Sequence, residues 1–327
     1  PDDAELAMIL TQEGNIRFSQ GEYGLAEGFY DRVVALDQEE YSVSELYYMC
    51  AKCRLLLEDS EGALSDCELG LGLLKDSDTC EADIYVMRGT AYVYLGEYAL
   101  ASADYNTAIE KGYSDTETLY EQISLCSYLA GDYTQTIAAS GQTGSSSSGD
   151  SSSWTCLSYY SLGRYAEAAA AYEDLLDTDQ SYYTTAQIYS CIAKCRIMLG
   201  SYDEAITKCN AGLNTGDSSE AGTLYALRGT AYMSKSEFET AINDFLTAVD
   251  CGYTDPASLY AQCAACSYYL GNSDDVLKYG AAAQNVGAGD TEAVLWMALT
   301  YYGQDDYENA ESLLERSLNI SQSYCDE

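Results

Sequence analysis

The chain of 327 residues contains no histidine and only two prolines, Pro1 and Pro256. The lack of histidine excludes Ser-His and Cys-His catalytic pairs, histidine metal ligands and a histidine pH switch. Proline interrupts helices because it lacks a backbone N–H and clashes with the preceding turn. So few prolines in so long a chain favour an architecture of packed helices.

Basic residues are also scarce, since 15 Lys and Arg stand against 53 Asp and Glu, a formal net charge of -38. Such a surface repels nucleic-acid phosphates and anionic lipid headgroups. We therefore expect no nucleic-acid partner, and we expect basic or apolar partners instead. No run of 18 apolar residues is present in the sequence, so this segment is not expected to insert into a membrane.

The sequence does not begin with Met and shows no signal-peptide pattern. Together with the low Lys content, this favours a bacterial protein processed at its N-terminus and exported or lipid-anchored at the cell envelope. The 13 cysteines are odd in number and scattered, which indicates a reducing or anaerobic setting rather than a disulfide framework. The compartment stays open, and a cytoplasmic location is the alternative.

A long internal duplication organises the chain. The segment Arg88–Tyr92 recurs 140 residues later as Arg228–Tyr232, and the segment beginning at Trp154 resembles the one beginning at Trp296, 142 residues on. This predicts a first module over 1–142, a second over 143–285 and a partial third over 286–327. The fourth repeat of each full module is degenerate, and the Ser-rich run 141–153 is predicted to be a loop.

A shorter period lies inside each module. Residues 89–108 read Gly-x2-Tyr-x3-Gly-x-Tyr-x2-Ala-x3-Tyr-x2-Ala, which resembles the tetratricopeptide repeat (TPR), a helix-turn-helix unit of about 34 residues. The same frame fits nine repeats, which start near residues 7, 44, 82, 117, 149, 186, 222, 257 and 291. The resemblance implies an all-α fold, an α-solenoid in which stacked helix pairs form a right-handed superhelix.

Two cysteine pairs, Cys50-x-x-Cys53 and Cys263-x-x-Cys266, have the spacing of a metal or redox site. Their places in the repeat frame are interior positions of the first helix, where Cys acts as a small hydrophobic residue. We therefore interpret them as buried thiols and expect no metal site and no cofactor. No phosphate-binding loop, dinucleotide fingerprint or nucleophile elbow is present, so no catalytic residue is assigned and a non-enzymatic protein is expected.

The TPR resemblance implies that the first helix of each repeat lines a concave groove, mainly through repeat positions two, five, nine, twelve and thirteen. These positions give an apolar to aromatic wall that suits a protein or peptide partner. The candidate groove residues are Asn15, Phe18, Tyr48, Lys52, Tyr94, Tyr128, Tyr160, Lys194, Met233, Tyr268, Tyr269 and Tyr302.

Several alternatives remain open from the sequence. Position twelve is equally compatible with packing between neighbouring repeats. An aromatic channel also suits a small molecule such as a glycan fragment, and the chain is compatible with the docking or sensor part of a larger protein. A homodimer is a further option.

The first repeat resembles the opening repeat of co-chaperone TPR domains, which hold a C-terminal carboxylate with Lys and Asn side chains. Only Asn15 matches the four clamp positions, because Thr11, Met49 and Asp83 occupy the other three. We therefore do not expect this chain to bind an acidic peptide tail.

Overall fold

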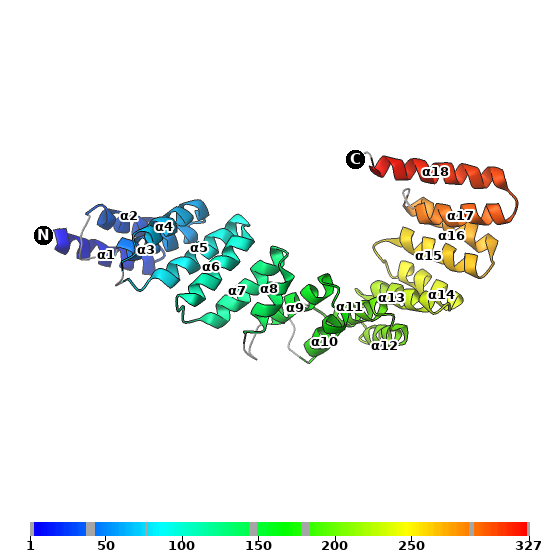
Figure 1. Cartoon of the computed structure of the whole chain (residues 1–327), viewed down its shortest axis with the longest axis horizontal. Helices are drawn as coiled ribbons and strands as arrows, with labels where there is room; N and C mark the ends of the chain where they lie inside the picture. The colour runs from blue at the N-terminus through cyan, green and yellow to red at the C-terminus, as the bar shows by residue number, and fades with distance from the viewer. Residues whose placement is uncertain are drawn as a thin grey trace. The chain divides into compact units, whose positions relative to one another are not determined.

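The computed structural model describes residues 3–36, 43–75, 78–143, 149–177, 183–287 and 291–325, with side chains omitted at 149–151 and 319–325. The described residues form eighteen α-helices and no strand (Figure 1). The helices are α1 (Asp3–Ser19), α2 (Tyr23–Val34), α3 (Val43–Leu56), α4 (Ser60–Gly72), α5 (Glu81–Leu95), α6 (Tyr98–Glu110), α7 (Thr116–Leu129), α8 (Tyr133–Ser140), α9 (Gly149–Ser161), α10 (Tyr165–Leu175), α11 (Thr185–Met198), α12 (Tyr202–Leu213), α13 (Ala221–Ser234), α14 (Phe238–Asp250), α15 (Pro256–Tyr269), α16 (Ser273–Val286), α17 (Thr291–Gly303) and α18 (Tyr307–Cys325).

The helices group into two compact units, residues 1–162 with α1 to α9 and residues 163–327 with α10 to α18. Within each unit, each helix packs on the next one along the chain. Successive helix pairs therefore stack into a solenoid. The division between units falls between α9 and α10. The modules predicted from the sequence have other boundaries, because they were defined by the internal duplication and not by helix packing. Those module boundaries stay a prediction.

The turn between the helices of each repeat has one residue in the left-handed backbone region. Glycine adopts this conformation without a steric penalty, whereas other residues rarely do. Six turns use glycine, and the others use Glu58 (φ 64°), Ser236 (φ 62°) and Asp305 (φ 59°). The tertiary packing of the helices therefore imposes this turn even where the sequence lacks the glycine that favours it.

Inside a repeat, a small residue of the first helix faces a larger residue of the second. A Cβ added at Gly14, Gly89 or Gly229 would come within 2.6–2.8 Å of the ring of Tyr30, Tyr105 or Phe245, respectively. Such an approach is too close for a side chain, so glycine is required at these three positions. The fully buried Cys67 takes the ring's place in the second repeat, where Ala51 takes the place of the glycine.

Two buried ion pairs occupy equivalent places in the duplicated modules. Arg88 donates from Nε and Nη2 to the two carboxylate oxygens of Asp104, each at 2.7 Å. Arg228 makes the same bidentate contact to Asp244 at 2.8 and 2.7 Å. Both aspartates are about 5% exposed. Each pair therefore links the first and second helices of its repeat with a charge-assisted contact shielded from water.

The predicted Ser-rich loop is shorter than expected. Residues 149–153 belong to the start of α9, and residues 144–148 lie outside the described residues. The Ser153 side chain is fully buried, and the Trp154 ring packs on Tyr128 of α7 at 4.8 Å between centroids. These tertiary contacts hold the segment in a helix, although its composition favours coil.

The second helices of the two degenerate repeats differ from each other. Helix α8 has only 8 residues, as its sequence indicates, whereas α16 runs for 14. The eighth repeat therefore has a full-length second helix despite its degenerate sequence. Gly280 of α16 leaves room for the Met297 side chain of α17, so a residue that weakens helix propensity is used for close packing. In the part of the chain that the structure describes, no helix is both long and apolar enough to span a membrane.

Candidate functional site

Large apolar side chains are exposed at several places of the described surface, and one recurrent place is repeat position thirteen, near the end of the first helix. We call these five residues the exposed row, and they are Leu56 (48% exposed), Tyr94 (70%), Leu129 (46%), Met198 (52%) and Tyr269 (60%). The first three belong to the first unit and the other two to the second. A repeated apolar contact surface thus follows the ends of the first helices within each unit.

Position twelve behaves differently, because most of its side chains are half-buried. Phe18, Tyr128, Tyr160 and Met233 are all in this class, and Met233 packs against the core of α13 to α16. Tyr128 lies between Tyr133 and Trp154. Much of this row therefore packs between repeats, which is the alternative that the sequence left open.

Three predicted residues of the first unit come together around Lys52. The Lys52 ammonium lies 5.3 Å from the centre of the Phe18 ring and 5.8 Å from that of Tyr48, distances suited to cation–π attraction. Burial raises the pKa of the Tyr48 phenol, and the nearby Asp83 carboxylate raises it further. The phenol therefore stays neutral and acts as a hydrogen-bonding group.

Two other predicted residues occupy places equivalent to Lys52 in their repeats. The exposed Asn15 side chain accepts a hydrogen bond from the Tyr30 hydroxyl at 2.9 Å. Lys194 is exposed on α11 of the second unit. Asn15 is thus engaged with the second helix of its own repeat, and Lys194 belongs to the other unit.

The second unit contains a continuous aromatic cluster from three successive repeats. Tyr269 stacks on Phe238 at 5.2 Å with the planes 16° apart, and the Trp296 ring lies 5.3 Å from Tyr268 and 5.6 Å from Tyr269. Sequence reasoning selected the two tyrosines but missed Phe238 and Trp296. Only the recurrence of Trp at equivalent places, as Trp154 in the second module and Trp296 in the third, signalled that Trp296 belongs there.

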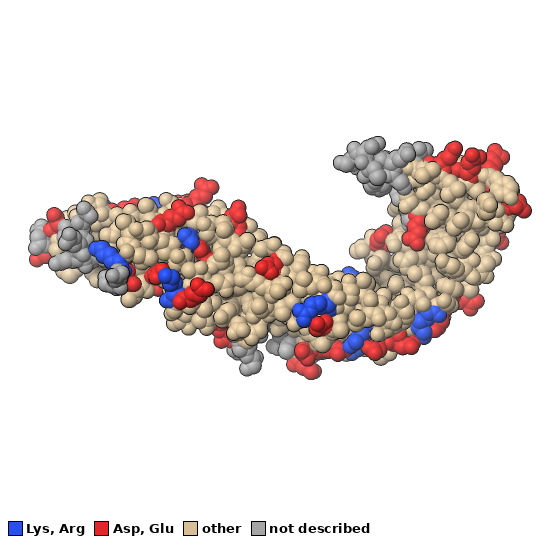
Figure 2. Space-filling view, viewed as in Figure 1, with Lys and Arg blue, Asp and Glu red and all other residues tan. Residues whose placement is uncertain are grey.

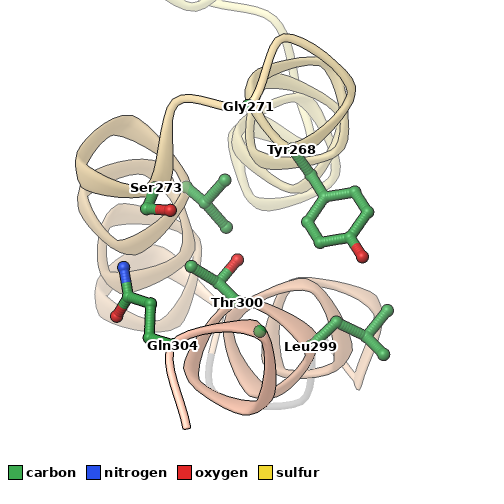
Figure 3. Close-up of a pocket in the computed structure, with 8 residues that line it drawn as sticks. Tyr268, Gly271, Ser273, Leu299, Thr300 and Gln304 are labelled. Carbon is green, nitrogen blue, oxygen red and sulfur yellow. The ribbon is translucent and has the colours of Figure 1, made fainter. Parts of the chain in front are cut away.

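Tyr302 lies apart from this cluster, 64% exposed, with its ring 5.6 Å from Tyr307 of the adjoining helix α18. Two of the predicted residues instead border cavities. Tyr94 lines an open cavity of about 540 Å³ in the first unit, together with Leu55, Leu56, Glu58 and Ser60. Tyr268 lines one of about 140 Å³ in the second (Figure 3).

Acidic side chains dominate the charged surface. On the face shown in Figure 2, the basic side chains lie beside acidic ones, and many acidic groups have no basic neighbour. Ion pairs already engage basic residues along both units, for example Lys111 with Glu81 at 2.6 Å and Lys235 with Asp203 at 2.7 Å. The remaining negative potential attracts cationic ligands and repels anionic ones.

The cysteines of both C-x-x-C pairs are buried and free. Burial raises the pKa of the Cys53 thiol to about 12 and that of Cys126 to about 11, and it raises the pKa of Cys50 as well. Cys50 donates to an Asp31 carboxylate oxygen at 3.6 Å. The described residues contain no group of three or more Cys, Asp or Glu side chains placed to hold a metal ion.

We expect a thiol-alkylating reagent to label the native chain selectively. Cys251 is exposed, whereas Cys53 and Cys126 are buried and their raised pKa values keep them protonated, and only the thiolate reacts. Cys251 should react at least roughly tenfold faster than either of them near neutral pH. Mass spectrometry of digested, time-resolved samples measures this, with denatured protein as the control. Equal labelling of Cys53 in the native chain would contradict the burial of this pair.

Comparison with known proteins agrees with the helix-pair architecture. Models of the tetratricopeptide repeat match residues 157–221 and, separately, 82–110 and 291–324. A solved structure of the C-terminal part of a TPR repeat-containing protein from Cytophaga hutchinsonii superposes with a TM-score of 0.50 at 15% identity, over 75% of this chain and 96% of that one. A tetratricopeptide repeat protein from Parabacteroides merdae gives a TM-score of 0.46 at 18% identity, over 79% and 98% of the two chains.

Among curated proteins, the mitochondrial import receptor subunit TOM34 of Mus musculus is 34% identical over 108 residues. The match covers 31% of this chain and 33% of that protein, so this chain spans about a third of the length of its curated relative. The repeat frame, the stacked helix pairs and these matches lead to one conclusion: segments 82–110, 157–221 and 291–324 match tetratricopeptide repeats, and the described residues have an all-α solenoid fold.

Proposed function

We propose that this protein is a non-enzymatic scaffold that binds a basic or apolar segment of a partner protein along the first helices of its repeats. The TPR family and fold are typical of protein–protein interaction scaffolds. The observation that carries the proposal is the exposed row, where large apolar side chains recur at one repeat position with exposures of 46–70%. Soluble proteins seldom expose apolar side chains in a regular array unless the array meets a partner.

Charge supports the choice of partner. The net charge of -38 steers cationic segments toward the surface and disfavours acidic ones. Aromatic side chains such as Tyr94 and Tyr269 offer flat contact area with a polar tip, and they suffer little loss of conformational freedom on binding. The proposed mode is therefore apolar contact along the exposed row, oriented by acidic groups around it.

The test is a selection of displayed random peptides followed by affinity measurements on the selected sequences. We expect the selected peptides to be rich in Lys, Arg and large apolar residues, and to bind more weakly at high salt. Tyr94→Ala and Tyr269→Ala should each weaken binding about tenfold, the effect of a typical interface hot spot. Leu100→Ala on the second helix α6, 48% exposed, is the matched control and should leave affinity unchanged.

Two outcomes would contradict the proposal. Affinity that is the same in both tyrosine variants as in the original chain would remove the exposed row from the interface. Affinity that does not change with salt would remove the role of the acidic groups. A panel of sugars in a thermal-shift assay tests the small-molecule alternative in parallel, because a bound sugar raises the melting temperature.

A further inference from the structure

The first residue of the second helix is aromatic in seven of the nine repeats and serine in the other two. The aromatic residues are Tyr23, Tyr98, Tyr133, Tyr165, Tyr202, Phe238 and Tyr307. The serines are Ser60, which begins α4, and Ser273, which begins α16. Each serine lines one of the two cavities described above. The cavities therefore coincide with the repeats that lack this ring.

In three repeats this ring packs on the aromatic side chain at repeat position twelve, near the end of the preceding helix. The centroid distances are 5.3 Å for Phe18 with Tyr23, 5.7 Å for Tyr128 with Tyr133, and 5.6 Å for Tyr302 with Tyr307. Because Ser273 has no ring, the corresponding face of Tyr268 borders the cavity between α15, α16 and α17 (Figure 3). The contact between this ring and the side chain at the end of the preceding helix is therefore missing in the eighth repeat.

The duplication supplies an internal reference for the missing ring. Tyr128 of the first module and Trp154 of the second correspond to Tyr268 of the second and Trp296 of the third, and the two pairs have similar geometry, 4.8 Å and 37° against 5.3 Å and 44°. The surrounding framework is thus conserved between the copies. The copies differ at one place. The space that the Tyr133 ring fills in the fourth repeat is open beside Ser273 in the eighth.

We propose that the Ser273 cavity receives an aromatic side chain, Tyr or Phe, from a basic segment of a partner protein. This rests on the proposed function and names the side chain that the scaffold recognises. The cavity volume is about 140 Å³, and an apolar cavity of about 150 Å³ accommodates benzene. Tyr268 and Leu299 provide apolar contacts, while Ser273 and Gln304 provide polar groups at its edge (Figure 3).

Local charge indicates that Lys or Arg flanks the incoming ring. Asp274 follows Ser273 and Asp305 follows Gln304, both are exposed, and neither forms an ion pair within the described residues. The nearby Lys278 is 3.8 Å from Asp275, so carboxylates outnumber cations among these residues. The Ser60 cavity shows the same combination, since the exposed Glu58 lines it next to Tyr94.

The first measurement uses p-cresol, the analogue of a tyrosine side chain, with protein carrying labelled methyl groups. We expect p-cresol to shift the NMR signals of Val276 and Leu299, which line the cavity. Ser273→Ala keeps the cavity open and should give the same shifts, whereas Ser273→Tyr supplies the missing ring from within and should abolish them. Ser273→Tyr should also raise the melting temperature, because the ring fills a void. Absence of shifts in the original chain overturns the proposal without reliance on any variant.

The second measurement compares a Lys-rich peptide that has one central Tyr with the same peptide carrying Ala. We expect the Tyr peptide to bind about tenfold more tightly, and this preference to disappear in the Ser60→Tyr, Ser273→Tyr double variant but not in the double Ala variant.

Equal binding of both peptides would overturn the cavity proposal and leave the scaffold function standing. Binding of neither peptide, with p-cresol shifts intact, would support the cavity and contradict the basic partner. Self-association abolished by Ser273→Tyr would assign the ring to a second copy of the chain and overturn a separate partner.

Discussion

Replacing Arg88 with Met is expected to lower the free energy of unfolding by roughly 3 kcal/mol, because the Asp104 carboxylate then stays buried without its counter-charge. The Asp104 side chain is 7% exposed and that of Arg88 is 22% exposed. Water reaches the arginine more easily than the aspartate, which places the loss at the lower end of the range for buried pairs. Urea denaturation followed by circular dichroism measures the change.

The control is Lys111→Met, which removes an ion pair of the same unit that is far more exposed. Lys111 lies 2.6 Å from Glu81, with side chains 43% and 33% exposed, so the loss should be much smaller than that caused by Arg88→Met. The double variant Arg88→Met, Asp104→Leu should recover most of the stability, since it leaves no charge buried. If Arg88→Met cost no more than Lys111→Met, the buried pair would not be stabilising this repeat.

The second large effect is expected from Phe245→Ala, with a loss of roughly 3–5 kcal/mol. Phe245 is fully buried, and its ring lies against Gly229, where the helices α13 and α14 approach each other. Removing the ring leaves a void that the two helices cannot close without losing their contacts to α15. Denaturation curves of the original and variant chains measure the loss.

A matched compensation tests whether the pairing of residue sizes explains this loss. The sixth repeat pairs Ala193 with Cys209, both fully buried, in the places that Gly229 and Phe245 occupy. We therefore expect Gly229→Ala to destabilise the original chain, because its Cβ would lie 2.7 Å from the Phe245 ring. The same change should stabilise a Phe245→Cys chain. Effects that simply add would contradict size complementarity as the cause.

Much of the fold follows from the repeat frame. The cysteines of both C-x-x-C pairs, which were predicted to be interior, are fully buried, and so are the repeat alanines Ala101 and Ala241. Periodicity suffices for such positions because each helix can bury only one face, and the stacking of identical units keeps that face the same in every repeat. For this reason the solenoid and its helix pairs are predictable from the sequence.

The candidate site was less predictable, because exposure of its residues depends on neighbours from other repeats. Tyr128 and Tyr268 occupy the same repeat position, yet the first packs against Tyr133 and Trp154 whereas the second borders a cavity. The repeat position alone therefore did not distinguish a residue that packs between repeats from one that lines a groove. Position thirteen was already among the predicted groove positions, and Tyr94 and Tyr269 there are 70% and 60% exposed.

By itself, the sequence determined that this protein is a stack of helix pairs with a strongly acidic surface, since periodicity and charge are properties of each repeat alone. Only the tertiary structure decided where the surface is open. It placed Glu58, Ser236 and Asp305 in left-handed turns and drew residues 149–153 into α9. It left space beside Ser60 and Ser273. Each of these features depends on side chains brought together from different helices, and packing between helices is what a local pattern does not record.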